Sequence, residues 1–218
     1  MRNARRQRRE PSERGTTLVE LLVSMSIFSV CMTLVFGAVI LAVGKANDVQ
    51  KSADAVGELR LALAQIDRQV RSGNVLFSPA NETSYVASCV GNVVTNSGTC
   101  MRIFTQANGS EKCVQWQIKD DPAKPGTKFL RTRSWAADWQ TSANLTPWST
   151  VARNLRLTAK DPFTLEGAAT PYKERLLNVS LDAYDARRKT TVNVSSSLSG
   201  RNTSYGYNAA QCTPVPPE

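Results

Sequence analysis

One carboxylate stands near the start of the longest apolar stretch of the sequence. Glu20 is the only formally charged residue between Arg14 and Lys45. An acidic residue at the centre of a membrane helix costs about 2.5–3.5 kcal/mol, and somewhat less near the interface. Such a residue is expected to be functional and to have a cationic partner. The alternative is a polar residue that lies at the membrane interface where the helix begins.

Most residue types that enzyme chemistry requires are missing. The sequence contains no histidine, which removes the commonest general base and the commonest metal ligand. It also contains no nucleophile elbow, phosphate-binding loop or dinucleotide fingerprint. We therefore expect no catalytic residues, no cofactor and no small-molecule substrate, and a membrane-tethered enzyme is the least favoured class.

Five cysteines are the remaining candidates for covalent chemistry. Cys31 lies inside the apolar stretch, where it is expected to act as a small apolar residue. The other four lie beyond that stretch, and an even number outside the cytoplasm indicates two disulfides with three possible connectivities. We favour Cys89 with Cys100, closing a short polar loop, and Cys113 with Cys212, fixing the C-terminal tail to a sheet. Zinc is disfavoured because no pair has the C-x(2–4)-C spacing.

Three aspartates could hold a cation. Asp121 and Asp161 each precede a proline, which is typical of turns, and Asp120 is adjacent to the first of them. No loop has the alternating oxygen ligands of a calcium site. We therefore expect no metal.

Aromatic side chains could form a stacking surface for sugars or bases. Core packing and the anchoring of loops are the commoner roles and the ones expected here. The candidates are Trp116, Trp135, Trp139, Trp148, Tyr85, Tyr205 and Tyr207.

The apolar stretch is long enough to span a membrane. From Thr16 to Gly44 it exceeds the roughly 20 residues that a membrane helix needs. It lacks the small-x-small cleavage pattern that follows the apolar core of a secretory signal, so the helix is expected to be retained. The preceding leader has six arginines and two glutamates, a net charge of +4 that leaves +5 of the total +9. Because basic residues stay on the cytoplasmic side, the N-terminus is expected inside and the head outside the cytoplasm.

The start of the sequence resembles the class III signal of type IV prepilins and type II secretion pseudopilins. A short basic leader ends in Gly15, and Thr-Thr-Leu-Val-Glu-Leu-Leu follows, with Glu20 fifth after the glycine. The resemblance implies that prepilin peptidase cleaves between Gly15 and Thr16 and N-methylates Thr16, where the family usually has Phe or Met. It also implies that Glu20 pairs with the freed amine of a neighbouring subunit in a filament, which would compensate the buried charge.

The helical period continues beyond the apolar stretch, with apolar residues at three- and four-residue steps and charges between them. No proline occurs between Thr16 and Ser78, so we expect one helix roughly 80 Å long, at 1.5 Å per residue. Arg71-Ser72-Gly73-Asn74 indicates its end. The apolar positions are Val49, Ala53, Val56, Leu59, Leu63, Ile66 and Val70.

Beyond Val75, short alternating runs separated by Asn, Gly, Pro and Ser indicate antiparallel strands with one buried face. Burying that face against the amphipathic helix predicts an α+β fold. The strongest pair, 175–184 and 189–196, is expected to form a hairpin, and the tail from Gly200 is expected to be mobile except at Cys212. The other predicted strands are 85–90, 100–104, 113–118, 128–135 and 151–157.

These segments divide the chain into four expected parts: a cleaved leader (1–15), a transmembrane and filament-core helix (16–44), an amphipathic helix half (45–73) and a β-rich head with a C-terminal tail (74–218). In the order and texture of its segments, the head resembles the soluble domain of larger minor pilins and J-type pseudopilins. The expected packing of a long N-terminal helix on an antiparallel sheet also resembles the pilin fold.

The resemblance implies a minor pilin or pseudopilin that is stored in the cytoplasmic membrane and reaches the cell surface or a pilus on assembly. Its implied partners are prepilin peptidase, other pilin subunits and the membrane. The alternative is a DNA-uptake or adhesion subunit that binds a polyanion through basic head residues. The candidates for that role are Arg131, Arg133, Arg187 and Arg188.

Overall fold

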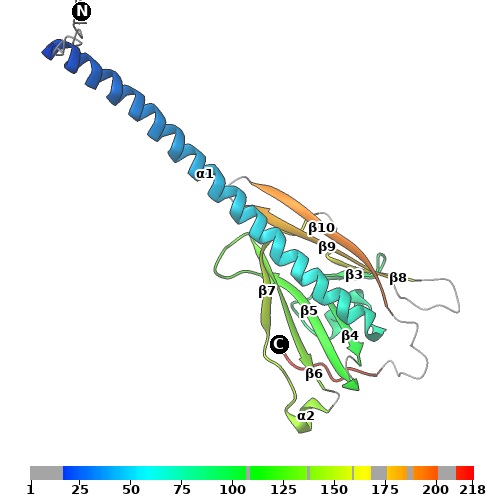
Figure 1. Ribbon diagram of the computed structural model, residues 1–218. Helices are drawn as coiled ribbons and strands as arrows, with labels where there is room; N and C mark the ends of the chain where they lie inside the picture. The colour runs from blue at the N-terminus through cyan, green and yellow to red at the C-terminus, as the bar shows by residue number, and fades with distance from the viewer. Residues whose placement is uncertain are drawn as a thin grey trace, which may run out of the picture. The chain divides into compact units, whose positions relative to one another are not determined.

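The computed structural model describes residues 17–106, 109–136, 138–158, 160–167, 176–185, 189–200 and 210–218. The chain divides into two compact units, Met1–Val49 and Gln50–Glu218. Helix α1 (Leu18–Arg71) contributes residues to both units (Figure 1). The predicted leader and the Gly15–Thr16 cleavage site lie outside the described residues.

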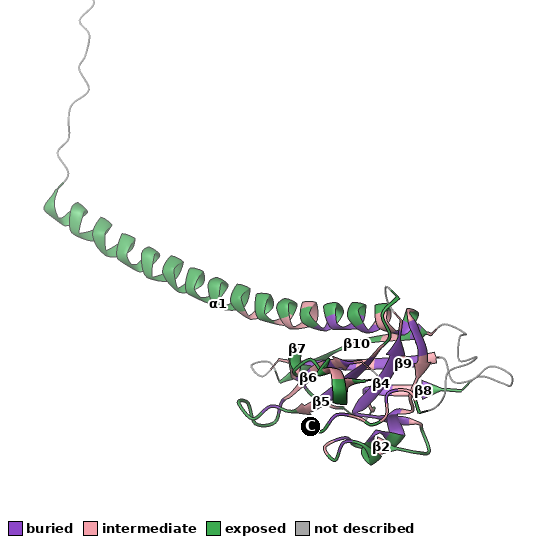
Figure 2. Ribbon diagram, turned by 90° about the horizontal axis from the view of Figure 1, so that it is seen from below, coloured by how far each residue is buried: buried purple, intermediate pink, exposed green. Residues whose placement is uncertain are grey.

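Helix α1 begins at Leu18 because Thr17 caps it. The Thr17 hydroxyl accepts a hydrogen bond from the Glu20 N–H at 3.3 Å, and the Leu21 N–H donates to the Thr17 carbonyl at 3.2 Å. A threonine that accepts from the N–H three residues on satisfies one of the orphan donors of a helix start. Between Leu18 and Val43 every residue of α1 is exposed (Figure 2).

The second part of α1 supplies the helical side of the core. Its buried residues are spaced three or four apart, so they form one stripe facing the sheet. The stripe begins later than predicted, because Val49 and Ala53 are exposed whereas Val56 is half-buried. The buried residues are Leu59, Ala62, Leu63, Ile66 and Val70.

The helix ends at Arg71, within the predicted stop signal. The Ser72 hydroxyl donates to the carbonyl of Arg68 at 2.9 Å, and Gly73 starts the first strand. A Cβ on Gly73 would lie 2.9 Å from a methyl carbon of Ile103 and 3.0 Å from the Gln69 carbonyl oxygen. Glycine is therefore required where the chain turns from the helix into the sheet.

In the described residues, ten strands form one antiparallel sheet with the order β1-β4-β5-β6-β7-β9-β8-β3-β2, and β10 pairs with β9. A 3₁₀ helix (Pro79–Ser84) follows β1, and a short helix, α2 (Trp139–Ser142), follows β6. The strands are β1 (Gly73–Leu76), β2 (Gly91–Asn92), β3 (Ser97–Gly98), β4 (Cys100–Thr105), β5 (Lys112–Asp120), β6 (Lys128–Trp135), β7 (Ser149–Leu155), β8 (Phe163–Glu166), β9 (Leu176–Asp185) and β10 (Thr190–Ser199).

Strand alternation gives the sheet a helix-facing side. On β5, Val114, Trp116 and Ile118 join the helix stripe in the main hydrophobic core. The Trp116 indole N–H donates to the Gln69 side-chain oxygen at 2.6 Å, so the largest core residue has its polar atom satisfied. This arrangement confirms the predicted α+β fold, with an amphipathic helix packed on an antiparallel sheet.

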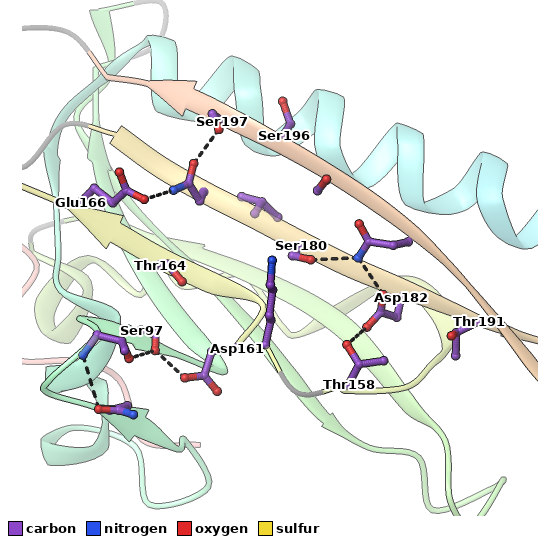
Figure 3. Close-up of a pocket in the computed structure, with 17 residues that line it drawn as sticks. Ser97, Thr158, Asp161, Thr164, Glu166, Ser180, Asp182, Thr191, Ser196 and Ser197 are labelled. Atoms are coloured by element: carbon purple, nitrogen blue, oxygen red, sulfur yellow. Dashed lines mark hydrogen bonds between the residues drawn. The ribbon is translucent and has the colours of Figure 1, made fainter.

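The opposite side of the sheet, called here the outer face, differs along its width. Over β4, β5 and β6 it is covered by residues 79–90 and by the tail 210–218, which enclose two smaller apolar clusters. Over β8, β9 and β10 it carries polar side chains that line an open trough (Figure 3).

Six of the predicted strands coincide with, or overlap, β4, β5, β6, β7 and the two strands of the β9–β10 hairpin, whose paired ends are Asp185 and Thr190. The strand predicted at Tyr85–Val90 is wrong. The N–H groups of Tyr85 and Val86 both donate to the Glu82 carbonyl at 3.0 Å, and the Cys89 N–H donates to the Val86 carbonyl. These turn hydrogen bonds occupy the backbone donors that a strand would use.

The prediction that Cys212 alone fixes the tail is also wrong for residues 210–218. The Arg133 guanidinium donates to the carbonyls of Pro216 and Pro217, at 2.7 Å each. Val215 packs against both outer-face clusters, and the Trp139 indole N–H donates to the Pro214 carbonyl at 2.9 Å. This part of the tail is held along its whole length.

Candidate functional site

The largest exposed apolar surface in the described chain is the first part of α1. Its aliphatic and aromatic side chains are mostly more than half exposed, for example 77% for Leu18 and 70% for Leu34. Removing each such side chain from water is worth about 1.5–3 kcal/mol. Within the described residues α1 is the one helix long and apolar enough to cross a membrane. The length and apolar character of this surface fit membrane anchoring.

The polar side chains of this surface are compatible with an apolar medium. Each hydroxyl donates to a backbone carbonyl three or four residues earlier, at 2.7–2.9 Å, so no hydroxyl proton is left unsatisfied. The residues are Ser24, Ser26, Ser29 and Thr33. Cys31, on the same part of the helix, is a free and exposed thiol.

Glu20 is the exception on this surface. Its backbone N–H is capped by Thr17, but its carboxylate has no hydrogen-bond or ion-pair partner within the described part of the chain. A carboxylate in the first helical turn interacts favourably with the helix dipole, yet this does not replace a cation in hydrocarbon. Within the described residues the site therefore has an acceptor and no donor. The predicted donor is the Thr16 amine of a neighbouring subunit, and Thr16 itself lies outside the described residues.

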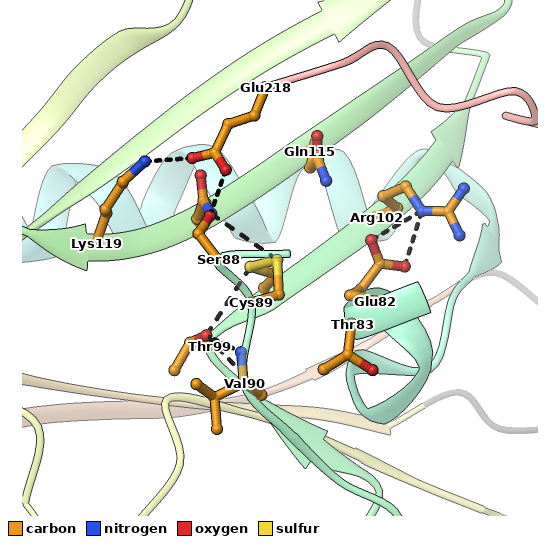
Figure 4. Close-up of a disulfide and its surroundings, with 12 residues drawn as sticks. Glu82, Thr83, Ser88, Cys89, Val90, Thr99, Arg102, Gln115, Lys119 and Glu218 are labelled. Carbon is orange, nitrogen blue, oxygen red and sulfur yellow. Dashed lines mark hydrogen bonds and ion pairs between the residues drawn. A yellow bond between two sulfur atoms is a disulfide. The ribbon is translucent and has the colours of Figure 1, made fainter. Parts of the chain in front are cut away.

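The four cysteines of the head form two disulfides. Cys89 is bonded to Cys100, with Cα atoms 5.7 Å apart, and joins the segment after the 3₁₀ helix to β4 (Figure 4). Cys113 is bonded to Cys212, with Cα atoms 5.5 Å apart, and joins β5 to the tail. This is the connectivity favoured from the sequence among the three that were open.

A buried ion pair lies beside these disulfides. Glu82 and Arg102 are 0% and 2% exposed, and the Arg102 Nε donates to both Glu82 carboxylate oxygens at 2.8 and 2.9 Å (Figure 4). The guanidinium also donates to the Cys212 carbonyl at 3.0 Å and lies 4.5 and 4.2 Å from the ring centres of Phe77 and Tyr85. Burial raises the pKa of Glu82, and the charge and hydrogen bonds of Arg102 oppose that rise. No sequence signal indicated this pair.

Two of the basic residues proposed for polyanion binding already have partners. Arg133 is 4% exposed and donates to Gln115 and to the tail carbonyls. Burial and the neighbouring charge of Arg131, partly offset by Glu218, lower the pKa of Arg133 to about 10. Arg131 donates to Gln117 and Glu218. Both guanidiniums lie over the Trp148 ring, 4.0 and 4.3 Å from its centre.

Glu218 completes this tail site. Its carboxylate accepts from Lys119 at 2.5 Å, from Ser88 at 2.6 Å and from Arg131 (Figure 4). Partial burial would raise the pKa of Glu218, but the hydrogen bonds from Lys119 and Ser88 and the charges of Lys119 and Arg131 outweigh burial and lower it to about 2. The tail therefore occupies this basic surface. Arg187 and Arg188 lie outside the described residues.

The candidate aromatic and acidic residues have structural roles where they are described. Trp116 and Trp135 are buried, while Trp139 and Trp148 are half-buried and contact the tail or its arginines. Tyr205 and Tyr207 lie outside the described residues. The aspartates do not converge: Asp120 pairs with Lys128, Asp121 accepts from the Ala123 N–H in a turn, and Asp161 accepts from Ser97.

Comparison with known families identifies the start of the chain. Residues 11–36 match the prokaryotic N-terminal methylation motif, and the matched range includes Gly15, Thr16 and Glu20. Comparisons with curated proteins and with solved structures find no significant match. The motif implies a structural protein that is processed by prepilin peptidase and assembles with other pilins, and the apolar helix fits membrane anchoring. Residues 11–36 of the chain therefore carry the N-terminal signal that is typical of type IV pilins and pseudopilins.

Proposed function

We propose that this protein is a minor pilin or pseudopilin, a structural subunit of a type IV pilus or a type II secretion-like filament. The observation that carries the proposal is the exposed apolar helix with one carboxylate, Glu20, that has no partner among the described residues and lies five residues after Gly15 of the predicted cleavage site. Cleavage after Gly15 would create an amine on Thr16, whose N-methylation leaves it cationic. That amine, on a neighbouring subunit, is the partner that Glu20 lacks.

The apolar surface of α1 suits both environments that the proposal requires, the membrane before assembly and the filament core after it. Before assembly, residues 16–44 would lie in the cytoplasmic membrane, with the basic leader inside and the head outside the cytoplasm. On assembly the apolar side chains would exchange lipid for the helices of neighbouring subunits. An ion pair between Glu20 and the new amine would then determine the axial register of the subunits, because an uncompensated charge in such a core is strongly unfavourable.

The size of the head favours a minor or tip subunit over a major one. The head has a ten-stranded sheet within the described residues and a disulfide-fixed covering on its outer face. A tip subunit benefits from a broad cap, whereas a major subunit must repeat compactly. This step rests on analogy with the family. The polyanion-binding alternative has less support, because Arg131 and Arg133 are engaged by the tail.

Two measurements test the proposal. Mass spectrometry of the protein from its native membrane should find a chain that begins at N-methylated Thr16. Glu20→Ala should leave processing and membrane insertion unchanged but lower its content in sheared filaments at least about tenfold, since breaking a buried pair costs about 3–5 kcal/mol. Asp54→Ala, which removes an exposed carboxylate farther along α1, is the matched control. A native chain that retains Met1–Gly15, or filaments with unchanged Glu20→Ala content, would contradict the proposal.

A further inference from the structure

The open part of the outer face lies on β8, β9 and β10. Along β9, Leu177, Val179 and Leu181 are buried in the core, so the alternate residues point the opposite way. Those alternate residues include Asn178 and Ser180, and both line the trough (Figure 3). The trough is therefore on the side of the sheet that α1 does not cover, in the Gln50–Glu218 unit.

Two loop segments raise the walls of this trough. One follows β7 and contributes Thr158 and Asp161, and the other is the β2–β3 hairpin, which contributes Ser97 (Figure 3). The volume of the open trough is about 1140 Å³. This exceeds the roughly 300–1,000 Å³ of a typical small-molecule pocket, so the trough has room for an extended ligand.

The lining is almost entirely polar. Of 17 lining residues, nine carry hydroxyls, three carry amides, three carry carboxylates, one is a lysine, and Val179 is the single apolar residue. A purely apolar ligand would leave the polar groups of these side chains without hydrogen-bond partners. Three carboxylates against one lysine also disfavour a polyanion, which would be repelled. The chemistry that remains is a ligand rich in neutral hydrogen-bonding groups.

Several of these side chains are held in place before any ligand binds. Asp182 accepts from the Thr158 hydroxyl at 2.6 Å and from the Asn193 amide at 2.7 Å. The Asn178 amide donates to Glu166 at 2.5 Å and its oxygen accepts from Ser197 at 2.6 Å. Fixed amides and carboxylates lose little rotamer entropy on binding, which is the requirement for a preorganised site.

Other groups in the trough remain available to a ligand. The hydroxyls of Thr164, Thr191 and Ser195 make no hydrogen bond within the described part of the chain, and Ser195 is exposed. A hydroxyl can donate one hydrogen bond and accept two. Free hydroxyls beside fixed carboxylates and amides match the vicinal hydroxyls of a sugar, which also donate and accept.

We propose that this trough binds a neutral oligosaccharide of several residues. The proposal goes beyond filament assembly, which uses α1, because the trough is built from strands and loops of the head alone. No aromatic ring is among the lining residues that the structure describes, which predicts weak, hydrogen-bond-dominated binding, since stacking usually supplies part of sugar affinity. A subunit repeated or clustered in a filament could compensate for weak single sites by avidity.

The test uses the full chain in a phosphocholine detergent, which has no sugar headgroup to compete. Binding of maltotetraose, cellotetraose, mannotetraose and chitotetraose is measured by saturation-transfer NMR and calorimetry. At least one tetrasaccharide should bind at millimolar concentration. Ser195→Trp should abolish that binding by filling the trough, and Thr164→Val should weaken it about threefold to tenfold, the value of one hydrogen bond.

Ser199→Trp is the matched control, because Ser199 is an exposed serine on the same strand that does not line the trough. It should bind the tetrasaccharide as the wild type does. The proposal is overturned if no tetrasaccharide binds, if Ser195→Trp binds as well as Ser199→Trp does, or if spermidine or Ca²⁺ binds in the trough in preference to every sugar. Unchanged thermal unfolding of the variants separates loss of the site from loss of the fold.

Discussion

Removing the Cys113–Cys212 disulfide should destabilise the head more than removing the Cys89–Cys100 disulfide. The first bond joins residues 99 apart and the second joins residues 11 apart. Chain-entropy estimates give about 4.7 kcal/mol for the longer loop and about 2.7 kcal/mol for the shorter one. We therefore expect the Cys113→Ala/Cys212→Ala variant to be about 2 kcal/mol less stable than the Cys89→Ala/Cys100→Ala variant.

The surroundings of the two bonds support this order. Cys113 and Cys212 are 0% and 3% exposed, in a cluster with Phe104 and Trp135. Without the bond, that packing and the Arg133 contacts to the tail carbonyls remain, but each forms only after a loop of roughly a hundred residues has closed. Alanine is used because a serine hydroxyl at these positions would be buried without a partner.

Urea unfolding of the full chain in detergent, followed by tryptophan fluorescence, gives the free energy of unfolding of each variant. Trp135 and Trp139 lie beside the tail, so their emission reports on the region that the longer disulfide fixes. Equal stability of the two double variants, or a larger loss for Cys89→Ala/Cys100→Ala, would refute the loop-length reasoning.

Three further predictions concern the head and the part of α1 that packs on it. Glu82→Leu should cost about 3–5 kcal/mol, because it leaves Arg102 buried without its anion, whereas the Glu82→Leu/Arg102→Leu double variant should recover much of that loss in urea unfolding. The lowered pKa of Glu218, about 2, gives stability that is present above the unfolded value near 4.5 and is lost as pH falls towards 2, so Glu218→Gln should flatten the wild-type pH dependence of unfolding in that window. Ile66→Ala should cost about 2–5 kcal/mol because Ile66 is fully buried. Leu61→Ala on the exposed side of α1 should change the free energy of unfolding by less than about 0.5 kcal/mol. Equal losses of stability for Ile66→Ala and Leu61→Ala would contradict the assignment of the buried stripe to the Ile66 side of the helix.

The elements that could be predicted from the sequence have local causes. The length of α1 follows from the absence of proline. Its end follows from Ser72, whose hydroxyl satisfies a carbonyl of the last turn, and from Gly73, where the chain turns away from the helix. The strands β5 and β6 are long, with nine and eight residues, and on β5 the apolar Val114, Trp116 and Ile118 alternate with Gln115 and Gln117. The predictions failed for short or cross-linked segments. Strand β8 was not predicted because it has only four residues. The strand predicted at Tyr85–Val90 does not form because backbone N–H groups there donate to the Glu82 carbonyl.

The candidate sites divide in the same way. Glu20 was recognisable because a charge in an apolar run is anomalous within a single stretch of sequence. The pairing of Glu82 with Arg102 was not, because it depends on burial and on contacts with Phe77 and Cys212 that no local pattern encodes. The number of basic residues likewise suggested that Arg133 is available on the surface. In the structure its guanidinium donates to backbone carbonyls of the tail.

Polar residues alternate along the outer faces of β5, β6 and β9 alike, and alternation alone would make all of them solvent-facing. On β5 and β6 the tail covers Gln115 and Arg133 and uses them as donors and acceptors. On β9 no described segment covers Asn178 and Ser180, so an equivalent polar row becomes the floor of a trough. A polar strand face therefore has a structural role where another segment of the chain covers it, and it is available to a ligand where no segment does. In this protein the two disulfides fix the segments that cover β4, β5 and β6, whereas none of the described segments covers the trough on β8, β9 and β10.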